Sequence, residues 1–392
     1  MKFAHIADCH IGGWREQELK VLGIKSLKKA AEICIKENVA FLLVCGDLFN
    51  TSLPQIDMVG EVANIFNKLR EKNIDAYIIP GSHDYSPSGK TMLDVLEKAG
   101  LVINVMKFEN DKLKFTEDKT GVKITGLYGR RSSLEKIDYS TLIKDHLEKE
   151  KGFKIFMFHT TLEEFKPKEL EKVQGESYTN MPKNFNYYAG GHVHYLFDTE
   201  KEGYGKIVYP GPLFPNNFKE LEEIKYGYIC IVDDKLNFKR VEIKLKEVES
   251  IKINVNSKNA QEVNEIINEE LNKRDLKDKI VTLRIFGELG SGKVSDINFN
   301  DMGKDVGAYI ILKNINNLKS KVFEKAEVEG SNAEEIEEII LKENKGYLNN
   351  EEKLSKELMN ILNEEKHEGE KNLDFEKRMI LNLLKLFKNE NK

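Results

Sequence analysis

The sequence predicts an α/β protein that continues into a small α+β region and a helical C-terminal tail. Residues 1 to about 245 alternate short apolar runs with helical segments, which is typical of a layered α/β domain. The alternation restarts on a smaller scale near residue 250. After about residue 318 the composition shifts to Glu, Lys and Asn. We therefore expect three parts, at residues 1–248, 249–317 and 318–392.

The first part opens with strands and helices in alternation. Its expected strands are the short apolar runs Lys2–Ala7, Ala40–Cys45, Ala76–Pro80, Lys154–Phe158 and Tyr187–Gly190. Its expected helices, Glu18–Glu37 and Ile56–Lys72, carry apolar residues at three- and four-residue spacing. Three later runs have no long helix between them: Lys206–Tyr209, Tyr226–Val232 and Phe238–Leu245. We expect these three to form an antiparallel second sheet packed on the first.

The second part repeats the pattern in miniature, with a strand, a helix and two strands. The expected elements are Ile251–Val255, Ala260–Lys273, Lys279–Phe286 and Gly307–Lys313. This order predicts a small α+β domain.

The tail contains three amphipathic stretches, Ala333–Lys342, Glu351–Leu362 and Asp374–Phe387. Apolar residues at helical spacing form a narrow stripe on the last two: Leu354, Leu358 and Ile361, then Ile380, Leu383, Leu384 and Phe387. Residues 363–372 resemble a flexible linker. A helix tethered in this way would bury its stripe against a partner. The alternative is that the tail folds back as a helical hairpin.

Composition limits the class of protein. The net charge of -5 excludes a global nucleic-acid-binding signature, so any contact with DNA needs local basic residues or bound metal. Four cysteines without CxxC spacing indicate buried thiols and a reducing cytoplasm. The apolar runs end far short of the roughly 18 residues that a membrane span needs. We therefore expect neither a membrane segment nor a signal peptide.

Six short strings carry the residues that suit catalysis. They are Asp8-Cys9-His10, Gly46-Asp47, Gly81-Ser82-His83-Asp84, Phe158-His159, Gly191-His192 and Val193-His194. Each follows a strand-like run, and open α/β sheets place ligand sites at the carboxyl ends of their strands. Five of the eight histidines lie in these strings. One such string alone is weak evidence, but their joint occurrence indicates a metal site.

Mixed histidine and aspartate ligands suit manganese, iron or zinc. Two such cations about 3.5–4 Å apart can activate water and neutralise a phosphoryl group. The strings therefore predict a two-metal phosphoesterase.

The strings resemble the signature of calcineurin-like metallophosphoesterases. In their extended forms, Phe3–Gly12, Cys45–Phe49 and Gly190–His194 resemble the nuclease subunit of the archaeal double-strand-break repair complex and its eukaryotic and bacterial relatives. The match covers roughly residues 1–235, whereas the second half matches in layout alone. The resemblance implies a four-layer sandwich of two mixed sheets flanked by helices, a capping domain and a helical tail.

The resemblance also implies a role for each residue of the strings. Asp8, His10 and His194 would hold one Mn²⁺, His159 and His192 the other, and Asp47 would bridge them. His83 would be the catalytic histidine, stabilising charge on the scissile phosphate and assisting the leaving oxygen. From its adjacency, we expect Asp84 to orient the His83 imidazole.

The implied activity is a manganese-dependent 3′-to-5′ exonuclease on duplex DNA ends and an endonuclease on single strands. The implied partners are DNA, a coiled-coil ABC ATPase held by the C-terminal helices, and a second copy of the chain in a homodimer formed by helices of the nuclease domain. The implied location is the cytoplasm, at the nucleoid.

Some positions depart from the family pattern. Ser82 stands where relatives offer an asparagine amide to the second metal, so it would reach that metal only through water. Asn50 replaces a common histidine, and Pro212 a small hydroxyl residue. Arg130 and Arg131 are either a DNA phosphate clamp or a solvated loop. Trp14 either caps the core or stacks on a base, and we favour the core.

Two other functions stay open at this point. One is a small-molecule phosphodiesterase or phosphatase with the same metals, since a fold does not name a substrate. The other is a weakly active architectural subunit, for which Ser82 is the support.

Overall fold

The computed structural model describes residues 1–86, 90–129, 135–299, 302–303, 305–320, 357–358, 361–362, 364, 366 and 372–389. The chain forms two compact units. Residues 1–253, 266–285 and 299–316 make up the first, and residues 254–265, 286–298 and 317–392 the second. All six catalytic strings lie in the first unit. The domain boundaries expected at residues 248 and 317 stay a prediction.

The first sheet carries the N-terminal strings and has the strand order β14-β13-β1-β2-β3-β4. Its strands are β1 (Lys2–Ile6), β2 (Phe41–Cys45), β3 (Asp75–Ile79), β4 (Ile103–Asn104), β13 (Gly227–Asp233) and β14 (Phe238–Ile243). β1 to β4 run parallel. β13 is antiparallel to β1, with Lys2 opposite Asp233, and β14 is antiparallel to β13. The expectation that these last two runs belong to the second sheet is therefore wrong, because β13 pairs directly with β1.

The second sheet has the strand order β11-β12-β10-β9-β8-β7. Its strands are β7 (Thr116–Glu117), β8 (Lys123–Leu127), β9 (Lys154–His159), β10 (Tyr187–Gly191), β11 (Phe197–Lys201) and β12 (Tyr204–Tyr209). The four central strands are parallel, and each edge strand is antiparallel to its neighbour. This sheet is therefore mixed and not antiparallel. A small hairpin joins β5 (Phe108–Glu109) to β6 (Lys112–Leu113).

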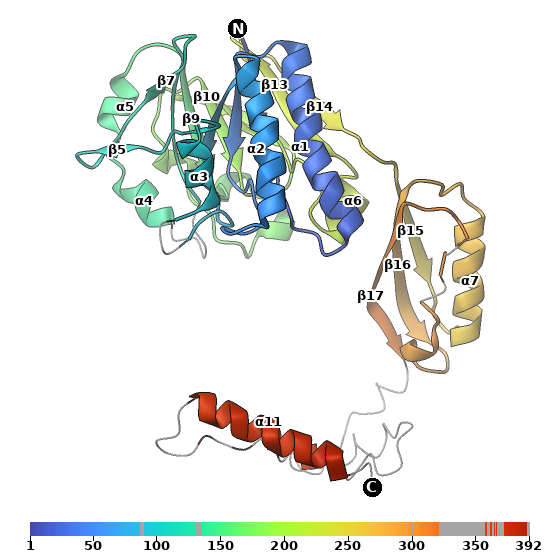
Figure 1. Cartoon of the computed structure of the whole chain (residues 1–392). Helices are drawn as coiled ribbons and strands as arrows, with labels where there is room; N and C mark the ends of the chain where they lie inside the picture. Colours follow the sequence, from blue (N-terminus) through green and yellow to red (C-terminus); the bar gives the residue numbers. More distant parts are fainter. Residues whose placement is uncertain are drawn as a thin grey trace. The chain divides into compact units, whose positions relative to one another are not determined.

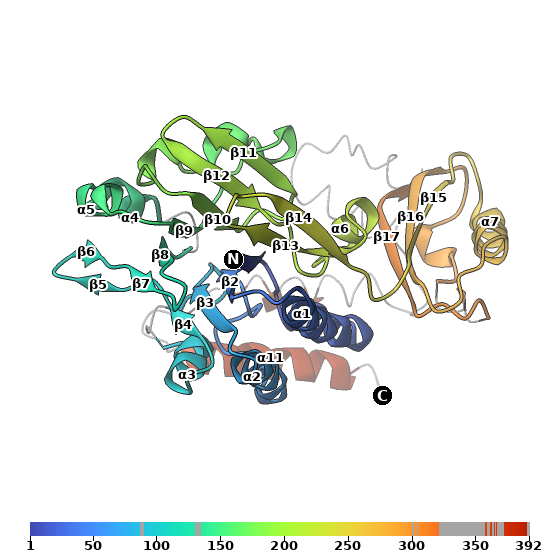
Figure 2. The same cartoon turned by 90° about the horizontal axis from the view of Figure 1, so that it is seen from above.

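Alternating side chains explain how the layers stack. On β1, Ile6 packs into a core beneath the helices of the first sheet, whereas Phe3 points into the core between the sheets. On the outer face of the second sheet, Phe158 packs with Tyr139 and Leu147 of two short helices. Figures 1 and 2 show this order of helices, sheet, sheet and helices. The predicted four-layer α/β sandwich is confirmed.

Two long helices cover the first sheet and lie side by side (Figure 1), α1 (Gln17–Glu37) and α2 (Ile56–Glu71). α1 buries Leu27, Ala30 and Cys34, which share one face, and it ends at Asn38 with the left-handed φ of 52° that is typical of helix C-termini. The other helices of this part are α3 (Met92–Lys98), α4 (Glu135–Thr141), α5 (Asp145–Lys149), α6 (Phe218–Glu223) and the 3₁₀ turns Glu163–Phe165, Lys168–Leu170 and Tyr178–Asn180.

The segment after residue 247 contains the strand, helix, strand, strand order that the sequence predicts. Its elements are β15 (Val248–Asn254), α7 (Ala260–Asn272), β16 (Ile280–Leu289), a 3₁₀ turn (Val294–Asp296) and β17 (Ile310–Ser320). The three strands form one sheet in the order β15-β16-β17.

In the tail, α11 (Asn372–Asn389) covers the last predicted helix. Ile380 and Leu384 are 55% and 51% exposed. Leu358, Ile361 and Leu383 are half-buried. Leu354, the side chain of Phe387 and the stretch Ala333–Lys342 lie outside the described residues. Within the described part of the chain, no helix has both the length and the apolar character to cross a membrane.

Candidate metal centre

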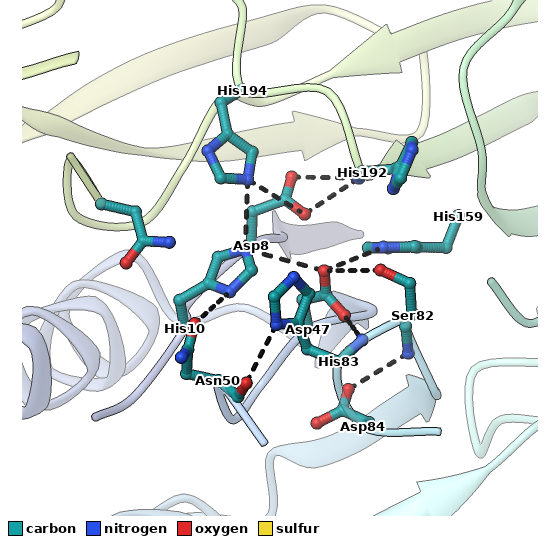
Figure 3. Close-up of polar contacts among 12 residues, drawn as sticks. Asp8, His10, Asp47, Asn50, Ser82, His83, Asp84, His159, His192 and His194 are labelled. Atoms are coloured by element: carbon teal, nitrogen blue, oxygen red, sulfur yellow. Dashed lines mark hydrogen bonds and ion pairs between the residues drawn. The ribbon is translucent and has the colours of Figure 1, made fainter. Parts of the chain in front are cut away.

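The ligand strings meet at the carboxyl ends of parallel strands from each sheet, and Figure 3 shows their side chains gathered in one place. β1, β2 and β3 are neighbours in the first sheet, and β9 and β10 are neighbours in the second. Asp8 and His10 follow β1, Asp47 follows β2, His83 follows β3, His159 ends β9, and His192 and His194 follow β10. The facing sheets therefore bring together ligands that lie up to 186 positions apart, from Asp8 to His194.

The ligand atoms form three overlapping groups, and within each group they lie within 4.8 Å of one another. The groups are Asp8, His10 and His194; His10, Asp47 and His83; and Asp47, His159 and His192. Asp47 belongs to two groups and is almost fully buried. This sharing is the arrangement that a bridging carboxylate requires.

Each of three imidazoles uses its Nδ1–H to donate to a protein oxygen. The acceptors are Asn50 Oδ1 for His10 (3.2 Å), the Cys45 carbonyl oxygen for His159 (2.8 Å) and Glu220 Oε1 for His194 (2.8 Å). Such bonds fix ring orientation and leave Nε2 as the metal-binding nitrogen. The imidazoles are therefore oriented for metal binding by the surrounding residues.

The Nε2 atoms point at one another and at the carboxylates. His10 Nε2 lies 3.1 Å from His194 Nε2 and 3.6 Å from Asp47 Oδ2. His159 Nε2 is buried 3.2 Å from Asp47 Oδ2, yet has no hydrogen-bond partner among the described residues. Ring nitrogens gathered around two buried carboxylates need a positive charge between them. The donor set therefore fits divalent cations with mixed nitrogen and oxygen ligands.

The carboxylates are held by backbone groups. The His192 N–H donates to Asp8, at 2.9 Å from Oδ1 and 3.2 Å from Oδ2. The His83 N–H donates to Asp47 Oδ1 at 2.8 Å, which leaves Oδ2 to face the imidazoles. Burial raises the pKa of Asp8 to about 6. Burial would also raise the pKa of Asp47, but the His159 and His10 imidazoles hold it below its usual range.

Four of the ligands adopt backbone conformations that non-glycine residues rarely take. Their φ angles are 52° at Asp8, 42° at His10, 51° at Asp47 and 90° at His192. Left-handed backbone costs about 1–2 kcal/mol per residue. Such strain persists only where the surroundings impose it, and it concentrates at functional sites. The strand ends are therefore bent to aim these side chains inward.

Glycines make room for the His159 imidazole. A Cβ atom on Gly46, which has a φ of 83°, would lie 2.1 Å from His159 Nδ1. A Cβ on Gly191 would lie 2.0 Å from the Cys45 carbonyl oxygen that holds this imidazole. Any larger residue at either position would displace a ligand.

The role expected for Asp84 is wrong. Its carboxylate accepts from the backbone N–H groups of Leu48 (3.1 Å), Phe49 (3.0 Å) and Gly81 (3.1 Å). The His83 imidazole instead donates Nδ1–H to the carbonyl oxygen of Asn50 at 2.9 Å. Asp84 therefore ties the loop after β2 to the loop after β3, and Asn50 orients His83.

Two further residues of the centre were not predicted in these roles. Glu220 orients His194, and the side chain of Asn50 orients His10. Neither lies in a ligand string, and no local spacing marks them. Ser82 Oγ lies 3.5 Å from Asp47 Oδ2, at the edge of the cluster. Its contact with a metal through water stays a prediction.

The predicted DNA contacts are placed in part. Arg130 and Arg131 lie outside the described residues. Trp14 donates its indole N–H to the Pro215 carbonyl oxygen at 2.8 Å and packs against the core cluster around Leu19. The interpretation of Trp14 as a core residue is confirmed.

A sandwich of two mixed sheets with clustered Asp and His ligands at its strand ends defines a metal-dependent phosphoesterase. The model of one such family, the calcineurin-like phosphoesterases, matches residues 1–196. The chain therefore belongs to this family, whose members bind divalent metals.

The chain is also similar to proteins named DNA double-strand break repair protein Mre11. The Archaeoglobus fulgidus protein is 26% identical over 64% of this chain and 61% of its own length. The Methanocaldococcus jannaschii protein is 25% identical over 68% of this chain and 72% of its own length, and that of Methanococcus maripaludis is 28% identical over 50% and 52%. The chain thus spans between about half and three quarters of these relatives.

Metal binding at this centre should release protons. Burial alone would lower the pKa of both His159 and His194. The Asp47 carboxylate raises the pKa of His159 to about 9, and the Glu220 carboxylate raises that of His194 to about 9. Burial lowers the pKa of His10 and His192 to about 3, so these two are neutral at pH 7. A cation at pH 7 must therefore displace protons from two imidazoles.

Apparent metal affinity should accordingly rise between pH 7 and pH 9, by up to about tenfold per pH unit for each displaced proton, and level off above pH 9. Titration calorimetry in two buffers with different ionisation enthalpies measures the protons released. His146→Gln is the control, because the His146 imidazole lies outside the ligand groups and contacts the Leu113 carbonyl oxygen. This variant should release the same number of protons as the wild type. Affinity that does not change from pH 6 to pH 9 would contradict this prediction.

Proposed function

We propose that this protein is a manganese-dependent DNA nuclease of a double-strand-break repair complex. The observation that carries the proposal is the Asp47 carboxylate, which is shared by ligand groups from both sheets. The similarity to archaeal proteins named for double-strand break repair supports DNA as the substrate. The proposed activities are 3′-to-5′ exonuclease cleavage of duplex ends and endonuclease cleavage of single strands.

The proposal assigns six ligands to two Mn²⁺ ions. Asp8, His10 and His194 would hold one, His159 and His192 the other, and Asp47 would bridge them. When bound, such a pair supplies a hydroxide nucleophile and neutralises the phosphoryl oxygens.

His83 would serve the leaving group in this mechanism. Its Nδ1–H is held by the Asn50 carbonyl oxygen, so Nε2 is the nitrogen that can face the substrate. A protonated Nε2 would stabilise charge on the scissile phosphate and deliver a proton to the departing oxygen. Asn50 would keep the ring in the orientation that this transfer needs.

The proposed partners follow the exposed apolar surfaces. Ile380 and Leu384 on α11 would dock on a coiled-coil ABC ATPase, because an amphipathic helix with an exposed stripe fits a partner groove. Leu53, which precedes α2, and Ile56, the first residue of α2, are 74% and 84% exposed, and Val95 of α3 is 52% exposed. These residues would form the homodimer contact between nuclease domains. The proposed function places the protein in the cytoplasm, at the nucleoid.

The test compares substrates and metals. End-labelled duplex DNA, single-stranded DNA and a generic aryl phosphodiester are incubated with the protein in Mn²⁺, in Mg²⁺ or with chelator. We expect product ladders from DNA in Mn²⁺ and none with chelator. Turnover of the aryl phosphodiester without DNA cleavage, in protein known to bind metal, would replace the nuclease with a small-molecule phosphodiesterase.

The Ser82→Asn variant tests whether the second metal site is weak. Asparagine offers an amide oxygen that can reach further than the Ser82 hydroxyl. We expect Mn²⁺ affinity to rise by about tenfold, and the cleavage rate in saturating Mn²⁺ to stay within about threefold of wild type. Rates are measured over a Mn²⁺ titration to separate the two effects. A large gain in rate at saturating metal would instead support an architectural subunit that is nearly inert in its natural form.

A further inference from the structure

α6 links the metal centre to β16. Glu220 lies on this six-residue helix (Phe218–Glu223) and places Oε1 2.8 Å from His194 Nδ1. The contact fixes the orientation of a ligand imidazole whose Nε2 lies 3.1 Å from that of His10. Any movement of α6 would therefore turn the His194 ring.

The first turn of α6 holds the Glu220 carboxylate firmly. Its Oε2 accepts from the Asn216 N–H at 2.7 Å, and the Glu220 N–H donates to Asn217 Oδ1 at 3.0 Å. Asn217 is the N-cap of α6, so Glu220 moves with the helix. The position of His194 thus depends on what positions α6.

Arg284 of β16 forms an ion pair with Glu222, a second carboxylate of α6. Its Nε donates to both oxygens of Glu222 at 3.1 Å, and its second guanidinium nitrogen donates to Oε2 at 2.6 Å. The guanidinium also lies over the Phe218 ring, 5.1 Å from the centroid. The Glu222 side chain is only 6% exposed, so water screens this pair weakly. Bidentate arginine–carboxylate pairs are the strongest of the charged hydrogen bonds and are geometrically specific.

Helices this short have little stability of their own, because nucleation costs more than a few backbone hydrogen bonds return. The location of α6 is therefore set by its side-chain contacts. Leu221 is fully buried in a cluster with Leu19, Ile280 and Leu312. Apolar packing in this cluster holds α6 against the domain but is not directional. The bidentate guanidinium–carboxylate contact is directional, so it sets the rotation of the helix about its axis. All these residues belong to the same compact unit.

We propose that Arg284 is a positioning residue of the metal centre, which acts through Glu222 and α6 to hold Glu220 against His194. The proposal rests on the metal centre of the proposed function. It assigns a role in metal binding to a residue 90 positions from the ligand that it positions. Removal of Arg284 should weaken the site that contains His194 and leave the site that contains His159 unchanged.

The first experiment measures Mn²⁺ binding by the full-length Arg284→Gln variant with titration calorimetry. We expect about tenfold weaker binding at one of two sites. Arg274→Gln is the matched control, because Arg274 pairs with Glu270 at 2.6 Å and with Glu249 at 3.6 Å, and neither of these residues lies on α6. The control should bind within about twofold of wild type. Wild-type affinity at both sites in Arg284→Gln would overturn the proposal.

A second experiment works without metal and reads His194 directly. With ¹⁵N-labelled histidine, the eight imidazoles of the chain give few signals, and His194→Gln assigns the Nδ1–H of His194. In Arg284→Gln this proton should exchange with water at least about tenfold faster, since its contact with Glu220 loosens. Unchanged proton exchange in Arg284→Gln would refute the role of Arg284, whether or not the wild type binds Mn²⁺. A wild-type protein that binds no Mn²⁺ would instead refute the proposed function.

A charge exchange keeps the proposal testable if Arg284→Gln does not fold. The double variant Arg284→Glu with Glu222→Arg restores an ion pair between β16 and α6. Glu222→Gln alone should weaken Mn²⁺ binding and speed the exchange of the His194 Nδ1–H. We expect the double variant to reverse at least half of each change, measured on a logarithmic scale. No recovery in a folded double variant would contradict the proposed link.

Discussion

Asp47→Asn should abolish cleavage and tight metal binding together. Asp47 Oδ2 lies 3.2 Å from His159 Nε2 and 3.6 Å from His10 Nε2, so its charge serves ligands of both groups. Asparagine keeps the size of the side chain but replaces one oxygen with an NH₂ group and removes the charge. A bound metal supplies several kcal/mol of transition-state stabilisation, and each 1.4 kcal/mol is tenfold in rate. We expect DNA cleavage in Mn²⁺ to fall by about 10³-fold or more.

The matched control for this substitution is Asp118→Asn. Asp118 is also buried, but it accepts from the Tyr77 hydroxyl at 2.8 Å and lies outside the three ligand groups. The Asp118→Asn variant should bind Mn²⁺ with wild-type affinity while losing some stability. Calorimetric metal titration and cleavage of end-labelled duplex are measured on both variants. An Asp47→Asn protein that retains tight binding at two sites would rule out Asp47 as the bridging ligand.

His83→Ala should separate catalysis from metal binding. If His83 acts on the leaving group, its loss removes a general acid, which is worth about 10²–10⁴ in rate. Metal affinity should stay within about twofold, because the six assigned ligands are intact. The structure also groups His83 with His10 and Asp47, so this measurement decides between a catalytic histidine and a further ligand. A loss of metal affinity that accounts for the whole loss of rate would favour the ligand.

His146→Ala is the control for His83→Ala. It removes an imidazole of the same size that bonds the Leu113 carbonyl oxygen at 2.7 Å, outside the ligand groups. Single-turnover cleavage in saturating Mn²⁺ should be unchanged in this variant. Equal losses in both variants would mean that the His83 effect reflects stability and not chemistry.

The strand ends show how much of the site the sequence predicts. Apolar runs that end in Asp or His can be read locally, because a strand has a fixed two-residue period and parallel strands share one edge. The expected helix Glu18–Glu37 agrees with α1 to within one residue, since its apolar spacing is regular. The same local pattern assigned β13 to the wrong sheet, because the sequence of an apolar strand does not show which strand it pairs with.

The orienting contacts show where local reading fails. Asp84 was expected to face His83 because the two are adjacent, yet consecutive side chains in a turn can point to different places. Its carboxylate accepts instead from Leu48 and Phe49, more than thirty positions away. The tail is similar in this respect, since its stripe predicts a helix but not the surface that would cover Ile380 and Leu384.

The sequence by itself determined the candidate metal ligands, their order along the chain and the α/β class, because these follow from residue type and from periods within single elements. The tertiary structure alone decided which groups hold those ligands in place. Glu220 contacts His194 across 26 positions, and Arg284 contacts Glu222 across 62. Contacts of this kind depend on how separate elements pack, and no repeat or spacing along the chain encodes that packing.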